Sequence, residues 1–402
     1  MFFPRRIYNA LTAHLKMPEA AILTGMRRTG KTAILQKLFA DINTDNKVYL
    51  DIENRINREI FLNLDYEDIW LNLKKTYGIS DKKRSFLFLD EIQYIKELPS
   101  IMKYLFDHHA VKFIVTGSSS FYLKNLFTES LSGRKQLFEL FPLTFDEFMV
   151  FKGKAKIVKH EESSLTELKK SDSWQKVNAS LFDEYLHFGG FPGVVLAESS
   201  SHKINLLKDI LYSYIDHDVR NLSSFKKIIE LEHLIKLLSA RIGQKLDVAK
   251  VSLELSLSRQ TILEYLGFLE KTYILFLIRP FSKSPDREIS KTPKIYFCDT
   301  GLANVLAQIS SGQILENQVF HNLKVKYAFN HPFSKIHYYQ KKNGVEIDFI
   351  LNQDIAIEVK ETSDAADLKR LVNVSGQIGM KKSVLISKNL TSAPEAIYAS
   401  QL

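Results

Sequence analysis

The sequence predicts an α/β fold with more than one domain, and three observations support this prediction. Residues 1–150 alternate short apolar runs with amphipathic segments, a pattern typical of a mostly parallel sheet covered by helices. A glycine-rich loop separates the first such run from the helix expected after it. Near the C-terminus, two runs of alternating residues flank a short turn, which indicates a second sheet. At 402 residues the chain is long enough for two or three domains.

The glycine-rich loop at residues 25–32 reads G-x-x-x-x-G-K-T, the phosphate-loop pattern. The apolar run at 20–23 predicts a strand before it, and the apolar spacing at 32–39 predicts a helix after it. In such a loop the backbone N–H groups approach phosphate oxygens, the lysine reaches the β- and γ-phosphates, and the next hydroxyl binds Mg²⁺. The residues expected to bind the nucleotide here are Gly25, Arg28, Thr29, Gly30, Lys31 and Thr32.

Two acids follow the continuous apolar run at 85–89, which predicts a strand buried on both faces. Ligands of open α/β sheets bind at the carboxyl ends of the strands, where these acids would lie. We expect Asp90 to hold Mg²⁺, directly or through water. Glu91 would orient and deprotonate the water that attacks the terminal phosphate. The alternative is a strand that ends in a solvated turn.

Two more residues in this part of the chain are candidates. Ser118 follows the strand expected at 111–116 and would sense the γ-phosphate; a serine-rich turn that caps a helix is an equal alternative. Arg134 follows a glycine and would act as an arginine finger on the γ-phosphate of its own or a neighbouring subunit. The second case requires a homo-oligomer. The alternative is an ordinary surface arginine.

The middle of the chain predicts helices. Residues 151–222 are expected to form a polar insertion followed by a helical, lid-like region, and 223–295 a winged-helix-like domain. In the latter, capping residues and apolar spacing predict helices at 248–255 and 259–271, with an apolar strand at 273–278 as a wing. Such a domain contacts DNA through the start of its second helix or serves as a protein–protein module, and both interpretations stay open.

The C-terminal runs at 345–351 and 355–360 predict a hairpin with a three-residue turn. The register that pairs apolar with apolar residues sets Asp348 opposite Glu358, about 5 Å apart at Cβ. These carboxylates could share one hard cation, with Lys360 beside them to stabilise charge or position a water. The alternative is a solvent-facing hairpin without chemistry.

An upstream acid adds to this hypothesis. Glu316 lies on the apolar stripe of a helix expected at 313–327, where a carboxylate needs a partner or a metal. With the two hairpin acids it would complete a set of carboxylates around one cation.

Composition sets broader limits. The 55 Lys and Arg residues against 46 Asp and Glu give a net charge of +9, which permits a nucleic-acid partner without requiring one. The single cysteine, Cys298, excludes an internal disulfide and favours a reducing compartment. The longest apolar run, 273–278, is too short to span a bilayer, and the N-terminus does not resemble a signal peptide. We therefore expect a cytoplasmic protein without a membrane part.

Six sequence blocks resemble those of the AAA-type ATPases of bacteria and archaea. They lie at residues 25–32, 89–93, 116–120, 132–134, 141–148 and 189–195. In the last block the family more often has an acid where Gly193 stands. The resemblance implies ATP as the nucleotide and an AAA-type ATPase domain at 1–150. In this group a C-terminal domain of unknown function follows, and here its acid on a helix, Asp, and Glu-x-Lys on strands resemble the PD-(D/E)xK nuclease core. A restriction-endonuclease-like α/β domain is thus expected at 296–402.

Together these patterns predict a Mg²⁺-dependent ATPase that acts on DNA. The expected catalytic residues are Lys31, Glu91 and Arg134 in the ATPase and Asp348, Glu358 and Lys360 in the nuclease-like domain. The expected metal ligands are Thr32, Asp90, Glu316, Asp348 and Glu358. The C-terminal domain would cleave or bind DNA. The alternative is a nucleotide-switched interaction or regulatory protein, in which that domain is a non-catalytic docking module.

Overall fold

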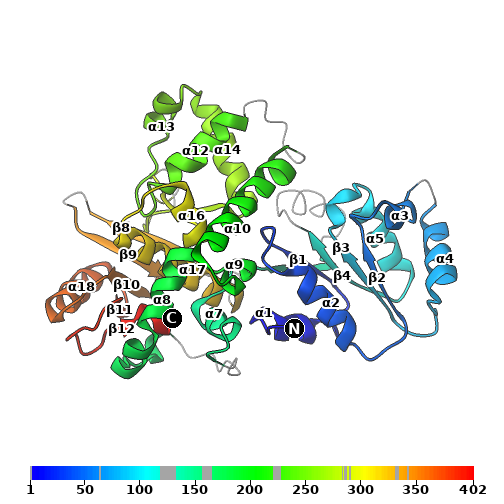
Figure 1. Cartoon of the computed structure of the whole chain (residues 1–402), viewed down its shortest axis with the longest axis horizontal. Coiled ribbons are helices and arrows are strands. Elements are labelled where there is room, and N and C mark those ends of the chain that lie inside the picture. The colour runs from blue at the N-terminus through cyan, green and yellow to red at the C-terminus, as the bar shows by residue number, and fades with distance from the viewer. Residues whose placement is uncertain are drawn as a thin grey trace. The chain divides into compact units, whose positions relative to one another are not determined.

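The computed structural model describes residues 2–62, 65–117, 133–155, 165–220, 228–282, 284, 288, 291–330, 335–341 and 344–402, without the side chains of residues 166 and 327–330. These residues form two compact units (Figure 1). The first comprises Met1–Phe141, Asp216–Ser223 and Lys271–Tyr273; the second comprises Pro142–Ile215, Ser224–Glu270 and Ile274–Leu402. Two short segments from the second half of the sequence thus belong to the first unit. The predicted division at residues 150, 222 and 295 stays a prediction.

The first unit is built on a five-stranded parallel sheet with the strand order β2-β3-β4-β1-β5. Its strands are β1 (Ala20–Thr24), β2 (Lys47–Asp51), β3 (Ser85–Asp90), β4 (Val111–Gly117) and β5 (Lys135–Glu139). Its helices are α1 (Ile7–His14), α2 (Lys31–Asp41), α3 (Arg55–Glu59), α4 (Tyr66–Tyr77) and α5 (Leu98–His108). The α/β fold class and the parallel sheet that the sequence predicts are confirmed.

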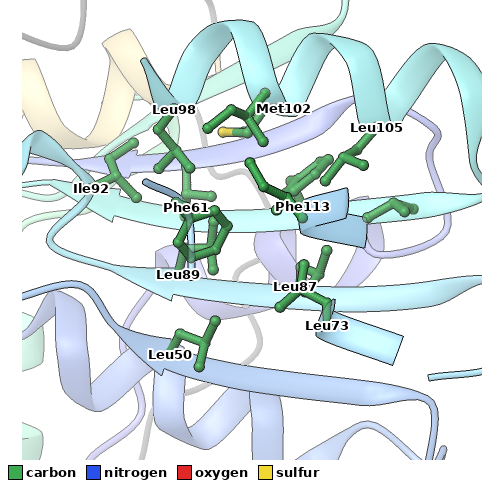
Figure 2. Packing of buried hydrophobic residues seen from close by; sticks show 14 of the residues in the cluster. Leu50, Phe61, Leu73, Leu87, Leu89, Ile92, Leu98, Met102, Leu105 and Phe113 are labelled. Carbon is green, nitrogen blue, oxygen red and sulfur yellow. The ribbon is translucent and has the colours of Figure 1, made fainter. Parts of the chain in front are cut away.

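Helices cover both faces of this sheet because its strands are apolar on both sides. Successive side chains of a strand point to opposite faces. On β3, Phe88 packs edge-on against Phe39 of α2, with ring centroids 5.4 Å apart. Leu87 and Leu89 point the other way, into a core shared with α4 and α5, where Figure 2 shows them near Phe113 and beneath α5. The double burial holds the ends of the strands rigidly, which positions the residues that follow them.

The second unit begins with helices. They are α7 (Phe145–Phe151), α8 (Asp172–Phe188), α9 (Pro192–Leu196), α10 (Ser200–Ser213), α12 (Ile228–Ser239), α13 (Val248–Leu255), α14 (Arg259–Lys271), α16 (Thr300–Leu306) and α17 (Ser311–Asn330). The bounds of α13 and α14 are those the sequence predicts, and Asp247 and Ser258 cap them as expected. Strands β6 (Leu275–Ile278) and β7 (Lys294–Phe297) pair antiparallel. The winged-helix assignment itself stays a prediction.

The glycine pair in the block at 189–195 has a packing role. Gly189 has a φ of +74°, and a Cβ atom there would lie 2.1 Å from Oδ1 of Asp299. The N–H of Gly190 donates to Oδ2 of Asp299 at 2.7 Å, while Oδ1 accepts the N–H of Leu302 at 2.9 Å and so caps α16. Burial raises the pKa of Asp299 to about 6. Only glycine allows this close approach.

A second sheet lies at the C-terminus, with the strand order β12-β11-β10-β9-β8. Its strands are β8 (Ile336–Gln340), β9 (Glu346–Leu351), β10 (Ile355–Lys360), β11 (Lys382–Ser387) and β12 (Ile397–Tyr398), and helix α18 (Ala365–Ile378) connects β10 to β11. The predicted hairpin is confirmed where Leu351 pairs with Ile355 and Phe349 with Ile357. The register is also expected from the sequence to continue to Asp348 opposite Glu358, but the ladder ends at Phe349 and Ile357. The N–H of Val359 instead donates to the Asp348 carboxylate at 2.7 Å, because that side chain competes for the donor.

No helix among the described residues combines the length and apolar character needed to cross a bilayer.

Candidate functional site

The phosphate loop joins β1 to α2 and is shaped by its two glycines. Gly25 has a φ of +151°, and a Cβ atom there would lie 2.1 Å from the carbonyl oxygen of Leu140, so another residue would not fit. Gly30 has a φ of +101° and is the N-cap of α2. The helix therefore begins without a side chain over its positive end, which leaves its N–H groups accessible to phosphate oxygens.

Arg5 braces this loop from outside the motif. Its Nη1 donates to the carbonyl of Thr29 at 2.9 Å and its Nη2 to the carbonyl of Phe141 at 2.8 Å. Only 6% of Arg5 is exposed. The side chain thus ties the loop to the end of β5. Sequence reasoning missed Arg5, because a lone arginine before a helix carries no pattern.

Lys31 lies buried in the loop as the pattern predicts. Its Nζ donates to the carbonyls of Gly25 at 3.0 Å and Met26 at 2.9 Å. Burial lowers the pKa of Lys31, while the nearby carboxylates of Glu91 and Asp218 act in the opposite direction. An ammonium group held by carbonyls alone is well placed to exchange them for the oxygens of an anion. Thr32, the next residue, is exposed at the start of α2.

Asp90 ends β3 beside this loop, because parallel strands bring their carboxyl ends to one edge of the sheet. It is 3% exposed, and the hydroxyl of Tyr49 donates to its Oδ2 at 2.9 Å. The Thr116 hydroxyl donates to its Oδ1. Both donors are neutral, so these bonds orient the carboxylate without cancelling its charge. Thr116 was missed by sequence reasoning, which favoured Ser118 two residues later; its polar side chain in the buried run at 111–116 was the available signal.

Glu91 follows in a backbone conformation that positions its side chain. Its φ of +54° is left-handed, which is uncommon for a residue other than glycine. The N–H of Glu91 donates to the Thr116 hydroxyl at 3.1 Å, and Nε2 of Gln93 donates to its carboxylate at 2.5 Å. Thr116 therefore links Asp90 and the backbone of Glu91 in one network. Asp90 and Glu91 are also within electrostatic range of Lys31, and the catalytic and metal-binding roles expected for these residues stay predictions.

A buried ion pair adds a residue from far along the chain. Asp218 lies in a π-helical turn, η3 (Tyr214–Val219), in a segment that belongs to the first unit. Nε of Arg27 donates to its Oδ2 at 3.1 Å, and the two side chains are 18% and 3% exposed. Burial raises the pKa of Asp218 to about 6, although Arg27 and Lys31 act to lower it. In the sequence, Asp216, His217 and Asp218 stand close together, which indicates a charged helix end rather than a metal site.

The remaining predicted residues of the first unit are placed differently. Arg134 precedes β5, and its carbonyl accepts the N–H of Ala20 at the start of β1. The phosphate loop lies at the far end of that strand, about 15 Å away, and Nε of Arg134 donates to Asp107 at 2.8 Å. This geometry does not support action on the phosphate of its own subunit; action on a neighbouring subunit stays a prediction. Arg28 is exposed, and Ser118 lies outside the described residues.

The C-terminal acids gather around a lysine. Nζ of Lys294 lies 3.2 Å from Oε1 of Glu316 and also pairs with Glu346. The hydroxyl of Tyr296 donates to Glu316 at 2.6 Å. Burial alone would lower the pKa of Lys294, but the carboxylates of Glu316, Asp348 and Glu346 raise it above its ordinary value. From sequence alone, Lys294 belongs to a modest basic cluster with Lys283, Arg287 and Lys291 in a loop, whereas in the structure it is the first residue of β7.

The two hairpin acids have separate surroundings. Burial and the neighbouring carboxylates of Glu316 and Glu358 raise the pKa of Asp348 well above its usual range. Glu358 pairs with Arg370 and, at 3.1 Å, with Lys360. In the part of the chain that the structure describes, no three Asp, Glu, His or Cys side chains are arranged to hold a metal ion. The metal-binding roles of Glu316, Asp348 and Glu358 stay predictions that would require these ion pairs to open.

Comparison with known proteins gives three matches along the chain. Residues 18–149 match a family model described as an AAA domain, which agrees with the phosphate loop and parallel sheet found there. Residues 179–313 and 311–399 match models described as domains of unknown function. The first unit thus has the fold of an AAA-type P-loop ATPase. A nuclease-like fold is not among these matches.

Relatives in other organisms match this chain over most of its length. An uncharacterized protein of Methanocaldococcus jannaschii is 28% identical over 362 residues, covering 87% of this chain and 77% of that protein. An uncharacterized protein of Haemophilus influenzae is 25% identical over 367 residues, covering 86% and 84%. The Walker-type ATPase of Pyrococcus abyssi is a structural neighbour with 16% identity and a TM-score of 0.49, covering 76% of this chain and 96% of its own.

Proposed function

We propose that the first unit binds ATP with Mg²⁺ and hydrolyses it. One observation carries the proposal: the buried ammonium of Lys31 lies within electrostatic range of Asp90 and Glu91 at the carboxyl edge of the sheet. A triphosphate on the loop would bring its γ-phosphate toward these acids. Thr32 and Asp90 supply the hydroxyl and carboxylate oxygens that Mg²⁺ prefers. The bound ion would neutralise charge on the β- and γ-phosphates.

In the reaction, a water attacks the γ-phosphorus in line with the bond to ADP. Glu91 accepts the water's proton as the new P–O bond forms. The bond between the γ-phosphorus and the bridging oxygen breaks, its electron pair stays on ADP, and inorganic phosphate is released. Lys31 holds the phosphate oxygens through this change. The Thr116 hydroxyl keeps Asp90 and the backbone of Glu91 in place.

Steady-state ATP turnover tests this proposal. Lys31→Ala and Glu91→Gln are each expected to reduce kcat by about 10²–10⁴-fold. Lys37→Ala on the same helix, whose side chain is 38% exposed, and the exposed Glu97→Gln serve as matched controls and should leave kcat within about twofold. Hydrolysis that survives both Lys31→Ala and Glu91→Gln would refute the proposal.

We further propose DNA as the partner of the ATPase. The net charge of +9 and the exposed Arg259 and Gln260 at the start of α14 support this choice. The test is ATP turnover with single-stranded, duplex and branched DNA, each at two salt concentrations. Stimulation that weakens with salt is expected, and turnover indifferent to every DNA would contradict the proposal.

For the C-terminal fold, the ion pairs favour the docking candidate over DNA cleavage. Lys294 and Arg370 form ion pairs with carboxylates that a nuclease would use to bind metal ions. We therefore propose that this fold binds a partner without cutting DNA. A cleavage assay with Mg²⁺ or Mn²⁺, run on the wild type beside Asp348→Ala and Lys360→Ala, decides the question. If the wild type cleaves DNA and both substitutions abolish cleavage, the domain is a nuclease and the docking proposal is refuted. If neither substitution affects cleavage, the activity comes from a contaminant.

A further inference from the structure

Phosphoryl transfer concentrates negative charge on the γ-phosphate oxygens, and many ATPases place an arginine there. Three arginines of the first unit are candidates. Arg134 lies at the wrong end of β1 and is paired with Asp107. Arg28 is exposed, with a left-handed φ of +65°. The third, Arg27, is largely buried although it belongs to the loop, which indicates that the fold holds it in place.

Arg27 pairs with one carboxylate and lies within electrostatic range of a second. Its Nε donates to Asp218 at 3.1 Å. Asp218 and Glu91 together raise the pKa of Arg27 above its ordinary value, although burial alone would lower it, and the hydroxyl of Tyr94 contributes a hydrogen bond. Its guanidinium is therefore within electrostatic range of the carboxylate expected to activate water. A guanidinium has five N–H donors in a rigid fork, and the bond to Asp218 uses the one at Nε.

Asp218 is placed to hold Arg27. It is 3% exposed, and its carboxylate lies within range of Arg27, Lys31 and Glu91. The next acid in the chain, Asp216, is 60% exposed and pairs with Arg220. A buried carboxylate close to the phosphate loop would repel the phosphates of ATP. The presence of Asp218 there therefore requires a compensating role. Fixing the guanidinium of Arg27 is such a role.

We propose that Arg27 is a catalytic residue that contacts the γ-phosphate of ATP in its own subunit, and that Asp218 is the residue that positions it. As the bond to ADP breaks and the water adds, Arg27 would neutralise the charge that grows on the γ-phosphate oxygens. The inference rests on the proposed ATPase function and extends it. It assigns the arginine to the loop itself, so hydrolysis would not require an arginine from another subunit.

Kinetics of loop variants test the assignment in the full-length chain. Arg27→Ala is expected to reduce kcat by about 10²–10³-fold, with KM for ATP and affinity for ADP changed less than about fivefold. Arg55→Ala, an exposed arginine of α3 that pairs with Glu59, is the control and should stay within about threefold of wild type. Arg27→Lys keeps the charge but loses the fork, so an intermediate kcat is expected.

A double-mutant cycle tests the positioning role. Asp218→Ala and Asp218→Asn are expected to lower kcat about tenfold or more in the wild type and to have no further effect in Arg27→Ala. A purely structural role for Asp218 would lower kcat equally in both backgrounds. The conservative variants Arg27→Lys and Asp218→Asn, with thermal melts of each protein, keep the test valid if an alanine variant fails to fold.

The outcomes separate the two proposals. Wild-type protein without ATP turnover would overturn the ATPase function and this inference with it. Turnover in the wild type that Arg27→Ala leaves within threefold would overturn the inference alone. Equal losses from Asp218→Ala with and without Arg27 would overturn the role of Asp218 as a positioning residue.

Discussion

The proposed ATPase site and the C-terminal group of acids both combine carboxylates with a buried lysine. The carboxylates differ in the partners that bind them. At the ATPase site, Asp90 receives its hydrogen bonds from two neutral hydroxyls. In the C-terminal cluster, Glu316 pairs with Lys294 and Glu358 with Arg370. A carboxylate bonded by hydroxyls keeps its charge for an external cation, whereas a paired one has already been neutralised. The partners of an acid therefore indicate a metal site better than its spacing does.

The largest expected difference concerns hydrolysis. Asp90→Ala should reduce Mg²⁺-dependent ATP turnover by at least about 10²-fold, because it removes the carboxylate proposed to hold the ion. Asp348→Ala, the equivalent change in the C-terminal cluster, should leave turnover within about twofold. Turnover would be measured over a range of Mg²⁺ concentrations. Similar losses of turnover from the two substitutions would show that the two groups of acids do not differ in their contribution to ATP hydrolysis.

Removing the ammonium group of Lys294 should have a large effect on the free energy of unfolding. Lys294→Met leaves Glu316 and Glu346 without their ammonium and is expected to cost about 3–5 kcal/mol. Lys381→Met removes an ion pair whose lysine is 73% exposed, so a cost of at most about 1 kcal/mol is expected. Urea unfolding in a Trp70→Phe background, followed through Trp174, reports on the second unit. A Lys294→Met protein as stable as Lys381→Met would show that the acids do not need their lysine.

A third kind of acid is held by backbone N–H groups and gives a pH dependence. Burial raises the pKa of Asp299 to about 6 in the folded chain, against about 3.9 when unfolded. Its contribution to stability is therefore full below pH 3.9 and lost as the pH rises through 6, a change of about 3 kcal/mol. Unfolding free energies from pH 4 to 7 should fall in the wild type and less steeply in Asp299→Asn. The exposed Asp183→Asn serves as the control and should keep the wild-type slope.

The smallest expected effect comes from a hydroxyl that orients Asp90. Thr116→Val keeps the shape of the side chain but removes the hydrogen bonds to Asp90 and to the N–H of Glu91. Loss of such a supporting bond is expected to lower kcat, or to raise the Mg²⁺ concentration needed, by about 10–100-fold. Thr12→Val on α1 is a matched control. Unchanged Mg²⁺ dependence in Thr116→Val would mean that Asp90 is oriented by Tyr49 alone.

The local sequence pattern predicted the features that depend on residues close together in the sequence. The strand, loop and helix around Lys31, the acids that end β3, and the first pairs of the C-terminal hairpin follow from spacing and alternation. Contacts across long separations could not be predicted this way. Arg27 and Asp218 are 191 residues apart, and Arg5 and Phe141 are 136 apart. Lys294 was identified as basic but not as buried, because its role depends on acids from α17 and β9.

The return of the chain to the first unit bears on how this protein can be divided. A gene fragment that stops at residue 149, the end of the matched AAA segment, would encode the full phosphate-loop pattern. It would lack Asp218, and it would also lack Tyr273, whose hydroxyl donates to Glu139 of β5 at 2.8 Å. Such a truncated product should be an impaired enzyme, so the ATPase cannot be transplanted as one contiguous piece of sequence.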